Sequence, residues 1–270
     1  MRRPELPALL SCCALLLAAC ATPATIKPPK IKGSERIAPT YQLEDSAATK
    51  RRVQVGDLLG RAAQRYAGGE FAEAEKLALR ALKLEPSAVD ALSLLGAVDS
   101  VQGNAARAGE RYRRAAELAP QRGDALNNYG AWLCANQHPA EALIWFDRAL
   151  AAPGYATPAA ALANAGGCAL ESGQVERAGQ DLDRALELDP ANAYALASMA
   201  RLQFRQGRYL HARAFNERRL AAAPADASVL QLAVKIEERL GDRVAASRYQ
   251  QRLREEFPHA VTANPGEDPT

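Results

Sequence analysis

Cysteine and histidine are the side chains in this 270-residue sequence best suited to nucleophilic or metal chemistry, and their spacing supports neither. The histidines His138, His211 and His259 stand 73 and 48 residues apart, and no second Cys or His pair has the spacing of zinc ligands. The sequence also lacks a phosphate loop, a G-x-S-x-G turn, an H-E-x-x-H pair and a dinucleotide fingerprint. We therefore expect a protein that is not an enzyme and has no metal, no cofactor and no small-molecule substrate.

Cys20 is placed for a different reaction, the attachment of lipid to a thiol. Two arginines precede an apolar run over residues 6–19, which is shorter than the roughly 20 residues of a membrane span, and the run ends in Leu-Ala-Ala-Cys at Cys20. This pattern resembles the bacterial lipobox, in which a peptidase cuts before a cysteine that carries diacylglycerol. An ordinary secretory signal or a poor membrane anchor is the alternative. We predict a lipoprotein signal peptide over residues 1–19 and lipidation at Cys20.

The residue after a lipidated cysteine influences sorting in Gram-negative bacteria. Here it is Ala21, not the aspartate associated with inner-membrane retention. By that resemblance we expect a protein held by acyl chains at the periplasmic face of the outer membrane. Residues 20–52 contain several prolines and lysines without apolar periodicity, which predicts a flexible tether.

Composition narrows the class of the remaining chain. A hydrophobic content of 48% with 24% charged residues is typical of a folded protein and argues against general disorder. The net charge is only +3, and acidic and basic residues are interleaved. Nucleic-acid binding usually requires a basic face or stripe, so we expect no nucleic-acid partner.

Residues 53–258 repeat one pattern six times. A small residue recurs in steps of 34, 34, 36, 34 and 34, at Ala74, Ala108, Ala142, Ala178, Ala212 and Ala246. Turn glycines stand at Gly69, Gly103, Gly173, Gly207 and Gly241, with Gln137 in the third unit. Each unit closes at Pro86, Pro120, Pro190, Pro224 or Pro258, and at Gly154 in the third unit.

This pattern resembles the tetratricopeptide repeat (TPR), whose period is 34 residues. The resemblance implies an all-α fold, a right-handed superhelical solenoid of six TPR helix pairs. Each pair cannot bury its apolar faces alone, so neighbouring pairs stack. The large residue on the first helix of each unit is leucine: Leu58, Leu92, Leu126, Leu162, Leu196 and Leu230. The sixth unit is polar, as a capping repeat should be, and we expect residues 259–270 to form a disordered tail.

Cys134 and Cys168 fall late in the first helices of units three and four. First helices of adjacent units are neighbours in a solenoid, and the periplasm is oxidising, so a disulfide is favoured. The alternative is a pair of small buried apolar side chains that align by chance. The 36-residue step places two extra residues before Thr157-Pro158, which indicates a longer loop followed by a helix start.

The first helices line the inner face of such a solenoid, and that face is the predicted partner-binding surface. Helical phase gives it small or mildly apolar residues, a trough suited to an extended or helical segment of another protein. Each small residue could equally serve helix packing. The candidate binding residues are Leu59, Ala63, Tyr66, Ser93, Ala97, Val101, Asn127, Ala131, Asn164 and Gly167.

The motif Ala125-Leu126-Asn127-Asn128-Tyr129-Gly130, the cysteine pair and the long step together resemble the type IV pilus biogenesis lipoprotein family called PilW or PilF. The resemblance implies a pilotin, a lipoprotein that helps the PilQ-like pilus secretin reach the outer membrane and form multimers there. It implies secretin subunits as partners, bound in the trough. A TPR scaffold lipoprotein for another envelope machine, such as outer-membrane protein assembly or peptidoglycan enzymes, is the alternative.

Overall fold

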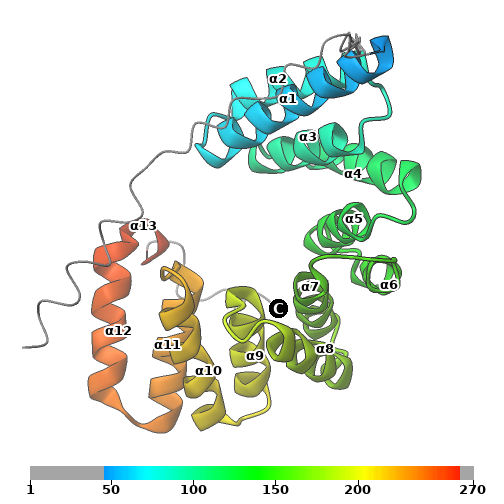
Figure 1. Ribbon diagram of the computed structural model, residues 1–270. Helices are drawn as coiled ribbons and strands as arrows, with labels where there is room; N and C mark the ends of the chain where they lie inside the picture. The colour runs from blue at the N-terminus through cyan, green and yellow to red at the C-terminus, as the bar shows by residue number, and fades with distance from the viewer. Residues whose placement is uncertain (1–45, 262–270) are drawn as a thin grey trace, which may run out of the picture. The chain divides into compact units, whose positions relative to one another are not determined.

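The computed structural model describes residues 46–261, and this part of the chain contains helices and no strand (Figure 1). Twelve longer helices are followed by a short one: α1 (Ala47–Ala67), α2 (Phe71–Leu84), α3 (Val89–Val101), α4 (Ala105–Leu118), α5 (Gly123–Ala135), α6 (Pro139–Leu150), α7 (Pro158–Glu171), α8 (Val175–Leu188), α9 (Ala193–Arg205), α10 (Tyr209–Ala222), α11 (Ala227–Leu240), α12 (Arg243–Glu256) and α13 (Pro258–Val261). None of these helices is long and apolar enough to cross a membrane. The predicted signal peptide, Cys20, most of the tether and residues 262–270 lie outside the described residues.

The helices form six pairs, each a repeat unit, and the predicted all-α repeat solenoid is confirmed. The two helices of a pair pack against each other, the second helix packs on the first helix of the next unit, and successive first helices also touch. Every predicted first-helix leucine is at least 97% buried, and the six recurring alanines of the second helices are buried as well. Small residues permit the close approach: a Cβ on Gly130 would lie 2.9 Å from the Phe146 ring.

The turns within units explain the spacing of glycine. Gly69, Gly103, Gly173, Gly207 and Gly241 all have φ between 73° and 80°, a left-handed conformation that only glycine adopts without strain. In the third unit Gln137 takes the same conformation, with φ of 66°. The turn therefore keeps its geometry when glycine is replaced.

The longer step between units three and four is a loop over residues 151–157, as predicted. It brings Tyr155 onto the start of α5, where a Cβ on Gly123 would lie 2.5 Å from the Tyr155 ring. Thr157 is the N-cap of α7 and Pro158 follows in its first turn, but the Thr157 side chain makes no capping hydrogen bond. The predicted helix start is confirmed, and its side-chain cap is absent.

Both ends of the described chain are more helical than predicted. Helix α1 begins at Ala47, because the Ser46 hydroxyl accepts a hydrogen bond from the Thr49 N–H, so residues 47–52 are not part of a flexible tether. These residues, Ala-Ala-Thr-Lys-Arg-Arg, are exposed except for the half-buried Thr49, and they have no apolar period to indicate a helix. Pro258–Val261 forms α13, so the first residues of the predicted tail are helical.

The core is divided along the chain. The largest cluster extends from the second helix of unit two to unit five and contains Ala116, Leu126, Phe146, Leu182 and Met199. Smaller clusters hold the first unit to the second and close the sixth unit. Helix α12 buries little beyond Ala246 and Tyr249, so the polar sixth unit does end the solenoid as a cap.

Candidate protein-binding surface

Three adjoining pockets follow the first helices of the later units. The first pocket lies between the α3–α4 turn and α5, the second lies over α5 and α7, and the third lies between α9 and α11. The first and second share Ala131 and Ala135, and the second and third share Tyr194. We call this row of three pockets the first-helix groove.

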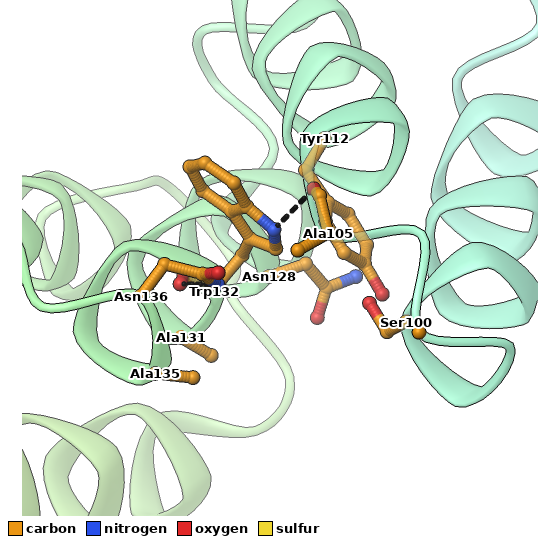
Figure 2. A pocket seen from close by; sticks show the side chains of 9 residues that line it. Ser100, Ala105, Tyr112, Asn128, Ala131, Trp132, Ala135 and Asn136 are labelled. Carbon is orange, nitrogen blue, oxygen red and sulfur yellow. Dashed lines mark hydrogen bonds between the residues drawn. The ribbon is translucent and has the colours of Figure 1, made fainter.

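The first pocket, of about 390 Å³, is lined by aromatic and small polar side chains (Figure 2). The Trp132 indole Nε1–H donates to the Ala105 carbonyl oxygen at 3.0 Å, which fixes the ring against the start of α4. The Asn136 amide donates to the Trp132 carbonyl oxygen at 2.7 Å. Gly109 is buried beneath the same ring, where a side chain would collide with Trp132. This wall of the pocket is therefore fixed before any partner arrives.

Tyr112, Ser100, Asn128 and Asn136 supply polar groups to the first pocket. Figure 2 shows the Tyr112 hydroxyl beside Ser100. Burial raises the pKa of Tyr112 more than the Ser100 hydroxyl lowers it, so the phenol stays neutral at physiological pH. Asn128 lines the pocket, and none of the side-chain hydrogen bonds in the described part of the chain involves it. Its amide is available to a partner's backbone.

The second pocket, of about 190 Å³, is lined by Cys134, whereas Cys168 is buried beside it. The sulfur atoms of Cys134 and Cys168 are 2.15 Å apart and their Cα atoms 5.9 Å apart, a separation suited to a disulfide between α5 and α7. Next to them, the Asn164 amide donates to Asn127 Oδ1 at 3.0 Å. Asn127 and Asn164 therefore hydrogen-bond each other between units three and four. This contact favours a role in packing over a role in binding a partner for these two residues.

The third pocket, of about 380 Å³, has the most charged lining residues of the three. Arg219 donates to the carbonyl oxygens of Ala223 and Pro224 and lies 3.0 Å from Asp226 Oδ2. Burial alone would raise the pKa of Asp226, but hydrogen bonds from Ser228 and Val229 and the Arg219 charge outweigh it and hold the pKa below its usual value. Arg201 enters the same pocket from α9.

The predicted binding residues fall into three groups. Ala131 and Asn164 line the groove. Seven other predicted residues line none of its three pockets: Leu59, Ala63, Tyr66, Ser93, Ala97, Val101 and Asn127. Gly167, also predicted to face a partner, does not lie on an open surface. It is buried, and its Cα is covered by Tyr194, whose hydroxyl would lie 2.5 Å from an added Cβ. Tyr194 thus fills the space beside Gly167 that helical phase predicts to be open.

Sequence reasoning missed several lining residues. Tyr112 stands on a second helix, and Arg219 reaches the groove from α10, so a phase argument confined to first helices could not find either. Trp132 is on a first helix beside Ala131, and its size next to a small residue was the available signal. No group of three or more potential metal ligands occurs among residues 46–261.

Comparison with known proteins agrees with this geometry. A tetratricopeptide repeat family model matches residues 169–236. The chain is 26% identical over 193 residues to the type IV pilus assembly protein PilF of Pseudomonas aeruginosa, covering 70% of this chain and 75% of that protein.

Two solved structures have the same fold. The crystal structure of PilW, described as a widely conserved type IV pilus biogenesis factor, is 29% identical, with a TM-score of 0.68 over 76% of this chain and 94% of that one. The structure of Pseudomonas aeruginosa PilF also has a TM-score of 0.68, at 22% identity over 78% of this chain and 96% of that one.

The stacked pairs, the repeat match and the solenoid neighbours define the class as an all-α TPR repeat protein with a groove along its first helices. Within this class, the chain is similar to the type IV pilus proteins PilF and PilW. The resemblance carried by the Asn-Asn-Tyr-Gly motif, the cysteine pair and the long step is thereby confirmed.

Proposed function

We propose that this protein is an outer-membrane lipoprotein that acts as a pilotin, an assembly factor for the secretin of the type IV pilus. The names of its relatives support the pilus as the machine: PilF is a type IV pilus assembly protein and PilW a type IV pilus biogenesis factor. The role is to bind protein and not to catalyse a reaction. The observation that carries it is the first-helix groove, which offers pockets in series to one extended or helical segment.

The anchor and the groove have separate tasks in this mechanism. Acyl chains on Cys20 hold the protein at the periplasmic face of the outer membrane, and a segment of a secretin subunit lies in the groove. The secretin is thereby delivered to the bilayer where it forms multimers. In the same compartment Cys134 and Cys168 are joined, which fixes α5 against α7 at the centre of the groove.

An immunoblot of the secretin from cell envelopes tests the function. Unheated detergent samples are compared with and without the gene. We expect the heat-labile secretin multimer to be lost in the deletion strain while monomer remains. Unchanged multimer, in amount and in membrane location, would exclude the secretin role and leave a scaffold for another envelope machine.

Two complementing variants separate anchor from groove. Cys20→Ala is expected to lose palmitate labelling and outer-membrane location, and with them normal secretin assembly. Ala135→Arg places a long charged side chain at an exposed position shared by two pockets, and is expected to stay at the membrane but fail to restore multimers. Ala140→Arg, at an exposed position on α6 that lines none of the three pockets, is the matched control and should restore them.

A further inference from the structure

Arg201 is left with an unmet hydrogen-bond donor in the third pocket. Its Nη2 donates to Ser198 Oγ at 3.1 Å, but its buried Nε has no hydrogen-bond partner. None of the ion pairs in the described part of the chain includes Arg201. A half-buried guanidinium normally donates hydrogen bonds from all its nitrogens and lies near a negative charge. Among residues 46–261, Arg201 has neither an acceptor for its Nε nor a carboxylate within ion-pair distance.

The other charges of this pocket already balance each other. Arg219 is paired with Asp226, whose lowered pKa keeps the carboxylate ionised at neutral pH. Asp226 is also held in place by its own helix, since it accepts hydrogen bonds from the Ser228 hydroxyl and the Val229 N–H. Asp226 is thus already paired with Arg219 and does not neutralise Arg201. The lining of the pocket therefore has one unbalanced positive charge, on Arg201.

The position of Arg201 on the groove makes this charge relevant to a bound segment. Arg201 and Ala197 are four residues apart on α9, with Tyr194 one turn earlier, and all three line the third pocket. Tyr194 also lines the second pocket, so a segment that leaves the second pocket past Tyr194 enters the pocket that Arg201 lines. In the second pocket the charged residue is Glu171, which would repel an acidic group there.

We propose that Arg201 is a specificity-determining residue that binds the carboxylate of an aspartate or glutamate side chain in the partner segment. The proposal rests on the proposed function in so far as a protein segment occupies the groove. A carboxylate would accept from Nε and a terminal nitrogen of the guanidinium together, the paired geometry that Arg offers to carboxylates. The acidic residue of the partner segment binds in the third pocket, and neutral or basic residues of that segment lie over Glu171.

Binding to a synthetic peptide library tests the charge preference without assuming a particular partner. The full chain in detergent is presented with random-sequence peptides, each made with Asp and Glu and again with Asn and Gln in their places. All peptides carry amidated C-termini, and a second set carries free ones. We expect acidic members among the bound peptides, with affinities about tenfold higher than those of their amide counterparts at low salt.

Two variants of different kinds identify the residue responsible. Arg201→Gln removes the charge and is expected to abolish the tenfold difference in affinity between acidic peptides and their amide counterparts. Ala197→Glu keeps Arg201 but supplies an internal carboxylate four residues away, and is expected to have the same effect. Arg254→Gln, an exposed arginine of α12 far from the pocket in sequence, is the control and should bind as the parent does.

Several results would overturn the proposal. They are the absence of any bound peptide, equal affinity for acidic and amide peptides, or an acidic preference that survives both Arg201→Gln and Ala197→Glu. A preference that depends on the free C-terminus would overturn the assignment to a side chain. Failure of the proposed function is scored separately, by unchanged secretin multimers in the deletion strain, and does not alter these outcomes.

Discussion

Among residues 46–261, Gln137 is the residue other than glycine that has a positive φ. It has φ of 66°, where the equivalent turns of the other units have glycine. A side chain in this conformation costs about 1–2 kcal/mol, offset in part because glycine makes the unfolded chain more flexible. We expect Gln137→Gly to stabilise the protein by about 0.5–1 kcal/mol, measured as a higher urea midpoint with an unchanged slope.

The reverse substitution is the control for this turn. Gly103→Ala places a side chain at φ of 78°, in open space, so any effect comes from the backbone. It is expected to lower the urea midpoint by an amount equivalent to about 1 kcal/mol. If Gln137→Gly were neutral while Gly103→Ala was destabilising, the third turn would owe its geometry to its surroundings and not to the residue.

The cysteine pair is the other prediction at the residue scale. A bond between Cys134 and Cys168, 34 residues apart, restricts the unfolded chain and should contribute about 3–4 kcal/mol. We expect the double variant Cys134→Ala/Cys168→Ala to lose this amount in urea unfolding, and reducing agent to affect the parent alone. Two titratable thiols in a denatured, non-reduced parent sample would contradict the bond.

At the scale of elements, the loop over residues 151–157 acts as a cover for the start of α5. The Tyr155 ring occupies the space that a side chain on Gly123 would need. We expect Tyr155→Ala to destabilise the protein by about 2 kcal/mol, because a half-buried ring is lost from the junction of units three and four. Tyr155→Phe keeps the ring and should remain within about 0.5 kcal/mol of the parent.

A double-mutant cycle shows whether this contact is direct. Gly123→Ala is expected to be strongly destabilising in the parent, since the added Cβ would meet both the Tyr155 ring and, at 2.9 Å, the Ala149 carbonyl oxygen. Its cost should be smaller in the Tyr155→Ala background. Strict additivity would mean that the loop does not rest on α5 in solution.

The helix pairs could be predicted from the sequence because their signals are local and repeated. Each turn requires glycine or a substitute, each second helix requires a small residue at one position, and six copies reinforce one another. The ends could not be predicted in this way. The first residues of α1 contact too little of the fold to need an apolar pattern, and their helix depends on the Ser46 cap.

The groove could be predicted only in part, because a binding surface depends on what neighbouring side chains cover. Helical phase correctly put Ala131 on an open face, and it put Gly167 there as well. The difference is Tyr194, which comes from the next unit and whose direction no phase argument supplies. The same applies to Asn127 and Asn164, whose mutual hydrogen bond joins units three and four.

At the scale of the whole solenoid, stability should be unequal along the chain. Each unit is supported only by its neighbours, so the end units have one supporting interface and the central units have two. The apolar clusters follow this rule: a single large cluster extends from Ala116 to Leu202, whereas that of the sixth unit is small. The groove therefore lies mainly on the most stable part of the protein.

Native-state hydrogen exchange measures this distribution directly. We expect the slowest exchange in helices α5 to α9, faster exchange in α1 and α2, and the fastest in α11 and α12. Reduction of the cysteine pair should lower protection chiefly in α5 and α7, with α1 and α12 as internal controls. Uniform protection from α1 to α12 would mean that the solenoid unfolds as one cooperative unit. The third pocket, between α9 and α11, would in that case be as rigid as the first, and a partner's acidic residue would meet a preformed site and not a mobile one.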